Sequence, residues 1–331
     1  MNEKRIYTAV FSALLLAALL FLIPYLQLLV IIIPFAAVFA VAYCGYAVGG
    51  VAVAAGFGAG FFFGTELMPA MIAAAFLPLA FAAGYMIREK KRFRNGVIVS
   101  CAAALAGSAL AILILTQVSG KSIVDFSADY MGSLLQTRGA EEVKLLYSTM
   151  RIGDLLSGAV TQAAIDATSA SDAIVRMQSI LRDVLNLNLV MIIILYSLVL
   201  GLLGYLIPRA LCKGRGSAVA DIPPFSEYTL PKRFWLGAVV SIIFTMIGAG
   251  FGWPAFDILQ VTIYNVYAFV FIVQGLSLLD YFLKTRNMGK GLRVVLGILA
   301  AVLLGMIVLP IVGLIENAFG IRKRIQSRKA V

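Results

Sequence analysis

The chain has 331 residues, of which 62% are hydrophobic and 13% are charged, and its net charge is +11. Because soluble domains are only about half apolar, this composition and a mean hydropathy of +0.98 indicate a protein embedded in a lipid bilayer. The sequence has no histidine and three widely separated cysteines. This excludes histidine-based catalytic triads and argues against structural zinc and haem, so we expect no metal and no cofactor.

Long apolar segments follow one another from the start of the chain. Residues 6–87 carry a single acidic residue, Glu66, and are divided by Pro24, Gly45 and Gly64. A bilayer-crossing helix needs about 20 apolar residues. The sequence predicts nine such segments, at about 6–23, 26–43, 45–63, 67–87, 96–118, 187–207, 234–252, 258–283 and 294–315. The predicted fold is therefore an all-α, polytopic transmembrane helical bundle of about nine spans.

Residues 119–186 differ from the rest, with six basic and eight acidic residues. Five predicted spans precede them, which makes them an extracytoplasmic insert between an N-terminal region, 1–118, and a C-terminal region, 187–331. Their apolar residues recur at helical spacing, which predicts amphipathic helices. The three apolar sets are Ile123, Phe126, Tyr130 and Leu134; Val143, Leu146, Tyr147 and Met150; and Ile174, Met177, Leu181 and Val184. Such helices could form a cap in the headgroup layer or a lid over a binding site.

Basic residues concentrate in loops, as they do on the cytoplasmic side of membrane proteins. With nine spans, residues 4–5, 88–94, 209–233 and 284–293 share one side, which we expect to be cytoplasmic together with the N-terminus. This distribution explains the net charge without a nucleic-acid partner. The basic tail, from Arg322 onward, does not follow the rule. Either the ninth segment crosses fully, as its length favours, or it folds back near Pro310.

The eighth segment is the most polar of the predicted spans. Gln260, Tyr264, Tyr267 and Gln274 fall within about a third of the helix circumference at 100° per residue. Amide and phenol groups are costly to expose to lipid, so these side chains either bond neighbouring helices or line a small-molecule pocket. We name the four as candidate ligand-binding residues. Asp280, at the end of this segment, is expected to pair with Lys284 one turn later.

Small residues form a stripe on the first segment. Ala9, Ala13 and Ala17 are four residues apart, a spacing that lets membrane helices approach closely. The stripe serves either packing within the chain or contact with a partner protein. No nucleotide-binding loop and no catalytic motif is present. We therefore expect a protein that is not an enzyme and that cannot power transport by itself.

Three regions of the sequence resemble a known family. They are the basic loop with Pro223-Pro224-Phe225 and Leu230-Pro231, the segment QGLSLLDY at 274–281, and the closing Arg322-Lys323-Arg324. Together they resemble the YybS-like family of uncharacterised bacterial membrane proteins, domain of unknown function 2232. That family is similar in its N-terminal half to the S components of energy-coupling-factor transporters. The resemblance implies that Ala9, Ala13 and Ala17 would contact the transmembrane T component.

Two functions stay open at this point. The first is binding, with uptake, of a small organic solute in the bacterial cytoplasmic membrane by an S-component-like subunit, with energy from a T component and separate ATPases. The second is a membrane scaffold or regulatory partner with no transported solute, in which the basic loop 208–233 is a docking segment. The sequence does not name the solute, the direction of transport or the oligomeric state.

Overall fold

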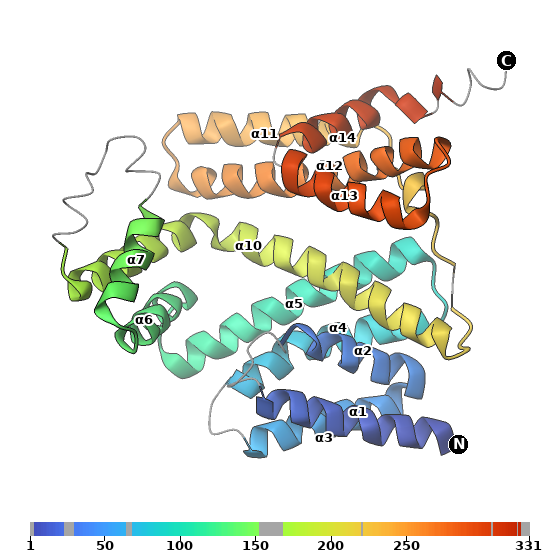
Figure 1. The fold of residues 1–331 in the computed structure, drawn as a ribbon, viewed down its shortest axis with the longest axis horizontal. Coiled ribbons are helices and arrows are strands. Elements are labelled where there is room, and N and C mark those ends of the chain that lie inside the picture. Colours follow the sequence, from blue (N-terminus) through green and yellow to red (C-terminus); the bar gives the residue numbers. More distant parts are fainter. Residues whose placement is uncertain are drawn as a thin grey trace. The chain divides into compact units, whose positions relative to one another are not determined.

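The computed structural model describes residues 3–22, 30–63, 68–151, 168–219, 221–305, 307–322 and 324–325. Within these ranges the regular secondary structure is helical, and no strand occurs (Figure 1). The elements are α1 (Glu3–Leu22), α2 (Ile33–Cys44), α3 (Tyr46–Phe63), α4 (Met68–Arg88), α5 (Phe93–Ser119), α6 (Ile123–Gln136), α7 (Ala140–Met150), α10 (Ala170–Gly214), the short 3₁₀ helix η2 (Phe225–Glu227), α11 (Phe234–Gly250), α12 (Pro254–Thr285), α13 (Lys290–Leu304) and α14 (Val308–Phe319). The prediction of an all-helical chain is confirmed for the described residues.

Each of the first eight predicted apolar segments overlaps one helix and the ninth overlaps two, and the helices differ in length. Among the described residues, four are long and apolar enough to cross a membrane: α1, α5, α10 and α12. The pair α13 and α14 makes a fifth if the two count as one broken span. The remaining apolar stretches whose side chains the structure describes are shorter: Ile33–Cys44, Tyr46–Ala59, Ala75–Arg88 and Phe234–Gly250. The chain is thus a multi-pass membrane protein by helix length, and nine full crossings stay a prediction.

The chain divides into two compact units. Unit 1 comprises Met1–Ser108 and Val190–Val331, and unit 2 comprises Ala109–Leu189. Unit 2 contains the predicted insert, 119–186, together with the adjoining turns of the helices before and after it. The predicted N-terminal and C-terminal regions both belong mostly to unit 1, and the division of the chain at 118 and 187 stays a prediction. An extracytoplasmic position for this unit stays a prediction.

The N-terminal helices of unit 1 pack through small residues. α1 lies along α3, and α2 packs against α3 and α4. A Cβ on Gly56 would lie 2.9 Å from the carbonyl oxygen of Ala13, and one on Gly84 would lie 2.6 Å from a methyl carbon of Val41. Glycine is therefore needed at both positions for the backbones to approach this closely, as in other membrane bundles. The core between these helices is filled by Leu16, Ile33, Val38, Val53 and Leu79.

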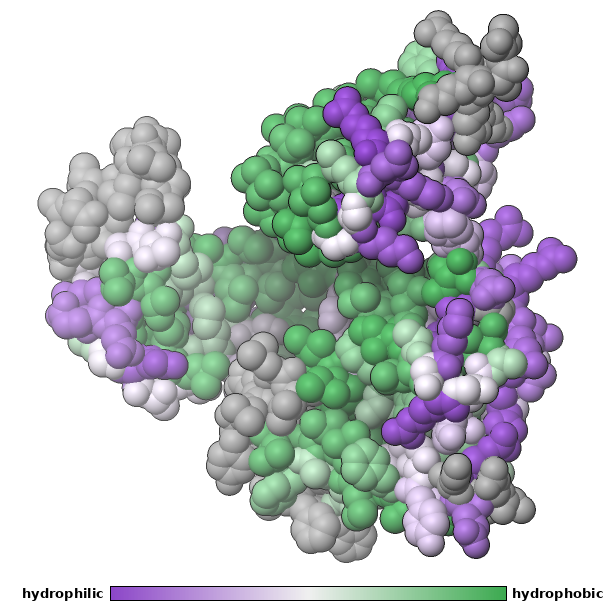
Figure 2. Space-filling view, turned by 45° about the vertical axis from the view of Figure 1, so that its right-hand side comes forward, coloured by the Kyte–Doolittle hydropathy of each residue, from purple (hydrophilic) through white to green (hydrophobic). Residues whose placement is uncertain are grey.

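Basic residues gather at one end of this bundle. Gly45, with φ +98°, turns α2 into α3 and lies beside the guanidinium of Arg88 from the end of α4. The Arg215 guanidinium, after α10, lies 5.0 Å from the ring centroid of Phe39. The turn between the second and third predicted spans therefore lies at the same end as two of the basic loops, which agrees with the nine-segment topology. Figure 2 shows hydrophilic residues gathered on the right-hand side of the lower body, next to a largely hydrophobic surface.

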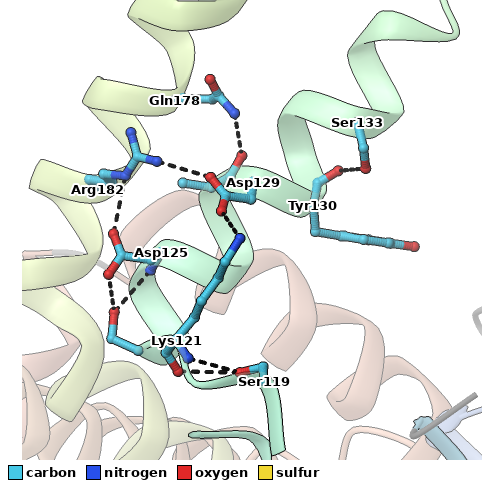
Figure 3. Close-up of polar contacts among 10 residues, drawn as sticks. Ser119, Lys121, Asp125, Asp129, Tyr130, Ser133, Gln178 and Arg182 are labelled. Atoms are coloured by element: carbon cyan, nitrogen blue, oxygen red, sulfur yellow. Dashed lines mark hydrogen bonds and ion pairs between the residues drawn. The ribbon is translucent and has the colours of Figure 1, made fainter.

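Unit 2 is held by a small core and by an ion-pair cluster. α6, α7 and the first turns of α10 meet around Leu135, Val143, Tyr147, Ile174 and Met177. Beside this core, Asp129 accepts from Lys121 at 2.7 Å and from Arg182 at 3.0 Å, and Arg182 also pairs with Asp125 at 3.3 Å (Figure 3). The hydrogen bond from Lys121, together with the charge of Arg182, lowers the pKa of Asp129 below its usual value.

Helix α6 has two different faces. The predicted apolar stripe includes Tyr130 and Leu134, which the chain itself leaves 41% and 46% exposed, so its contact with a headgroup layer or a binding site stays a prediction. The buried face instead carries Val124, Ala128, Gly132 and Leu135. Gln178 of α10 lies against this face and donates to the carbonyl oxygen of Ala128 at 3.0 Å, and its amide would have to move if Gly132 carried a Cβ.

The C-terminal helices cross where glycine allows backbone contact. α11 and α12 form an antiparallel hairpin, and α14 crosses α12 at Gly275 and Gly313. A Cβ on Gly313 would overlap the carbonyl oxygen of Phe271, and one on Gly275 would lie 2.5 Å from that of Leu309. Because no larger residue fits at either position, this crossing fixes the place of α14 on α12.

The predicted ninth segment is two helices, not one. α13 and α14 meet at an angle of 109°. Lys290, at the start of α13, lines a pocket with Phe225, and Arg322, just after α14, bonds the carbonyl oxygen of Ser226. Both ends of 290–322 therefore lie at the segment 223–231. At 1.5 Å per residue, the 15 residues of α13 span only about 22 Å. The structure thus favours the alternative in which this segment folds back.

We predict that the basic tail shares its side of the membrane with the basic loop after α10. In a cysteine-free background, Ser217→Cys and Ser327→Cys should both resist an impermeant thiol reagent in intact cells. Both should react after permeabilisation. The two sites are expected on the same side of the membrane because Arg322 bonds the segment that follows Ser217. Labelling of Ser327→Cys alone in intact cells would contradict the folded-back pair. Ser133→Cys, in unit 2, tests the external insert in the same assay.

Candidate binding site

The segment 223–231, which follows α10, is held against α12 by four side chains. These belong to α12, to α14 and to the tail, and we call them the loop clamp: Gln274, Ser277, Asn317 and Arg322. Pro223 and Pro224 favour an extended entry into the segment, and η2 supplies one tight turn. The segment has little regular structure of its own, so its backbone groups need side-chain partners.

The two α12 members of the loop clamp lie one turn apart. Gln274 is 1% exposed, and its Oε1 accepts from the backbone N–H of Leu230 at 2.8 Å. The Ser277 hydroxyl is fully buried and lies 2.6 Å from the carbonyl oxygen of Phe225 and 2.9 Å from that of Tyr228. Since a hydroxyl has one proton, it is shared between these two acceptors. The segment therefore rests on one polar face of α12.

The other two members reach the segment from α14 and the tail. Asn317 donates to the carbonyl oxygen of Pro231 at 3.0 Å and accepts from the N–H of Trp235 at 2.9 Å. Arg322 Nη1 donates to the carbonyl oxygens of Ser226 at 2.8 Å and Tyr228 at 2.9 Å. The loop clamp thus joins three parts of the chain that are about 45 to 95 residues apart in sequence.

Arg322 is buried together with its counter-charge. Its side chain is 5% exposed, its Nε lies 3.3 Å from Oε1 of Glu316, and its guanidinium lies 5.8 Å from the ring centroid of Tyr281. Burying a guanidinium costs several kcal/mol unless it is paired and hydrogen-bonded. The carboxylate of Glu316 pairs with the charge and two loop carbonyls accept from Nη1, whereas the buried Nε and Nη2 have no hydrogen-bond partner among the described residues. The tail is consequently anchored to the segment 223–231.

A pocket of about 620 Å³ opens next to the loop clamp. Pro224, Phe225 and Ser226 form one wall. The other two walls come from one face each of α12 and α13. The helical lining residues are Leu276, Leu279, Asp280, Lys284, Lys290, Arg293, Val294, Gly297, Ile298 and Ala301. By sharing Phe225 and Ser226 with the clamped segment, the pocket depends on that segment for its shape.

The charged residues of this pocket lie at one end. Asp280 Oδ1 pairs with Arg293 Nη1 at 3.0 Å, with the two side chains 20% and 14% exposed. The Nε of Arg293 is buried and has no hydrogen-bond partner among the described residues. The Nζ of Lys284 lies 3.7 Å from the Oε1 of Glu227. The pair predicted between Asp280 and Lys284 is therefore wrong, because α13 folds back and brings Arg293 to Asp280 instead.

The family model described as "Predicted membrane protein (DUF2232)" matches residues 9–315. The chain belongs to this family. The match includes the segment 223–231 and helices α12 and α13, and so the whole lining of the pocket. No curated protein matches the chain, and no solved structure does. The residues of this family member must therefore be interpreted from their own chemistry.

The four predicted ligand-binding residues of this DUF2232 protein do not surround one cavity. Tyr264 and Tyr267 line a second pocket of about 170 Å³ with Phe271 and Pro310, whereas neither glutamine lines it. Tyr264 is 56% exposed. Gln274 belongs to the loop clamp, where it bonds the segment 223–231 and not a neighbouring helix. A ligand-contact role for Gln260, Tyr264, Tyr267 and Gln274 stays a prediction.

The alanine stripe of this DUF2232 protein faces the chain's own helices. Ala9 is 5% exposed and packs with Cys44 and Ala52, and Ala13 packs beside them. Ala17 is half-buried. A partner-contact role for Ala9, Ala13 and Ala17 stays a prediction, and it would require α3 to move away from the first two.

Sequence reasoning missed Ser277, Arg293 and Arg322 as site residues. Ser277 and Arg322 bond backbone carbonyls, which leave no mark in a sequence. Ser277 lies three residues after Gln274, inside the QGLSLLDY segment, and this shared helical face was the one available signal. Arg293 could not be assigned before the direction of α13 was known.

We predict that Gln274→Leu destabilises the protein and that Gln260→Leu does not. The first change leaves the half-buried N–H of Leu230 without its side-chain acceptor, and an unsatisfied donor in a buried position costs about 1–3 kcal/mol. Gln260 is only half-buried, and the same substitution there serves as the matched control. Thermal unfolding in one detergent measures both. Equal midpoints for the two variants would contradict the role given to Gln274.

Proposed function

We propose that this membrane protein binds a small organic solute in the pocket between α12, α13 and residues 224–226. The main support is the pocket itself. Its volume of about 620 Å³ falls within the about 300–1,000 Å³ that is usual for small-molecule sites. Its lining is mostly apolar with a few convergent polar groups, which is the usual composition of such sites. The pocket at Tyr264 and Tyr267, at about 170 Å³, is smaller than that range.

Gly297 supports the same proposal. It lines the pocket from the middle of α13, and a Cβ added there would meet no atom within 4 Å. Glycine inside an exposed helix costs about 1 kcal/mol relative to alanine. Among the described residues, no packing contact requires glycine at this position. A role in keeping space for a ligand accounts for it.

Uptake is the further part of the proposal. The protein would act without enzymatic activity in the bacterial cytoplasmic membrane, with its N-terminus in the cytoplasm, as a YybS-like protein related to S components. Energy would come from a T component and separate ATPases. The gathering of Arg88 and Arg215 at one end of the N-terminal bundle supports this orientation, because cytoplasmic ends are rich in cations.

The scaffold alternative receives less support. It uses the segment 223–231 as a docking site for a partner, but Leu230 and the carbonyls of residues 225, 226 and 228 are already bonded within the chain. A partner could contact only the exposed side chains of this segment, such as Phe225, which is 48% exposed. The loop clamp therefore favours a role in shaping the pocket.

We predict that Gly297→Leu removes a solute that copurifies with the natural protein. The leucine side chain would occupy the pocket, and its higher helix propensity would leave the fold intact. Mass spectrometry of extracts from protein purified in a defined detergent measures the retained compound. We expect at least a tenfold loss relative to the natural protein.

Gly291→Leu provides the matched control. Gly291 also lies on α13 with no atom near an added Cβ, but it does not line the pocket. This variant should retain the compound at the natural level. The proposal fails if the natural protein carries no compound above a detergent blank, or if Gly297→Leu retains as much as Gly291→Leu.

A further inference from the structure

We infer that the pocket takes an anionic amphiphile, with a phosphate or carboxylate head at Lys290 and Arg293 and an apolar tail along α13. This inference rests on the proposed solute binding and names the class of solute. It follows from three features of the pocket: the order of residues along its two helical walls, the balance of charge at one end, and the exposure of its apolar part.

Polar and apolar lining residues are separated along both helices. On α13 the lining begins with Lys290 and Arg293 and continues with Val294, Gly297, Ile298 and Ala301. On α12, which enters the pocket from the other end, apolar Leu276 and Leu279 precede Asp280 and Lys284. The two charged ends meet at the ion pair of Asp280 with Arg293. The apolar stretch from Val294 to Ala301 is about 10 Å long at helical rise, which suits a hydrocarbon chain and not a compact polar solute.

The charged end has an excess of cations. Lys284, Lys290 and Arg293 line it, against one lining carboxylate, Asp280. Asp280 already forms an ion pair with Arg293, and Lys284 lies near Glu227, which is just outside the lining. Lys290 has no ion pair among the described residues, and the buried Nε of Arg293 has no hydrogen-bond partner there. Because α13 begins at Lys290, the positive end of the helix dipole adds to this charge. An anionic head would give Lys290 an ion-pair partner and the Nε of Arg293 a hydrogen-bond acceptor.

The apolar end is open to a hydrophobic surface. No residue of α13 is buried, and Val294 and Ile298 are 62% and 61% exposed although both line the pocket. In a bilayer this surface faces lipid, so a chain could enter sideways while its head stays at the basic end. The basic end adjoins the loop predicted to be cytoplasmic, where anionic lipid heads are abundant.

The test compares lipids that differ only in head charge. Full-length protein, delipidated in a neutral detergent, is titrated with phosphatidylglycerol or with phosphatidylcholine of the same acyl chains, and bound lipid is counted by native mass spectrometry. We expect the anionic lipid to bind at least tenfold more tightly. Glycerol 1-phosphate, the head without its chains, should not displace it at equal concentration.

Three variants locate the binding. Gly297→Leu should abolish the bound-lipid species. Lys290→Gln should weaken phosphatidylglycerol about fivefold, as expected for one cation at a membrane surface, and leave phosphatidylcholine unchanged. Arg286→Gln removes the same charge from the neighbouring turn, outside the lining, and should change the affinity less than twofold. Lys290 and Arg286 are both exposed, so neither change threatens folding.

Several outcomes would overturn the inference. Equal affinity for the two lipids would show that the pocket does not recognise an anionic head. Displacement by free glycerol 1-phosphate would show that the acyl chains do not contribute to binding. Equal effects of Lys290→Gln and Arg286→Gln reduce the binding to general attraction by a basic protein. A retained compound that depends on Gly297 but carries no charge would leave the proposed function standing and this inference wrong. If Gly297→Leu binds as much lipid as the natural protein, the assignment of the lipid to this pocket is refuted.

Discussion

A buried guanidinium organises the C-terminal half of this protein. Arg322 donates to the carbonyl oxygens of Ser226 and Tyr228 and pairs with Glu316, and its side chain is 5% exposed. A charge at this depth is tolerated only when its partners stay in place. The position of the tail, the course of the segment 223–231 and the wall of the adjoining pocket are therefore linked. Losing any one of these contacts leaves a buried polar group unpaired.

Glycine supplies the second constraint. Gly275 and Gly313 let α14 cross α12 with backbone contact, which brings Asn317 and Arg322 to the segment. The 109° bend between α13 and α14 lets one apolar stretch begin and end at the same basic end. α13 is thereby left with no buried residue, covering a pocket whose apolar side is open. The crossing at Gly275 and Gly313 therefore packs α14 closely onto α12, whereas α13 stays exposed.

The sequence predicts the helical class and the positions of the apolar segments, because burial in lipid demands long apolar runs. It does not predict where helices shorten or bend, since Gly305 and Pro310 are compatible with either a kink or a break. It does not indicate the face of α6 that is buried within the chain, because Ala128 and Gly132 on that face are too small to stand out as packing residues. Gln274 was correctly singled out as buried and polar, but its partner, the N–H of Leu230, is a backbone group that any residue except proline would offer.

Hydrogen exchange of the segment 225–235 in detergent tests the loop clamp most directly. The amides of Leu230 and Trp235 are bonded to side-chain oxygens of Gln274 and Asn317, so they should exchange far more slowly than those of Asp221 and Ile222, which precede the clamp. Slow exchange at Leu230 that becomes fast in Gln274→Leu is the predicted result. Equally fast exchange at all four amides in the natural protein would contradict a clamped segment, and with it the pocket wall that the segment forms.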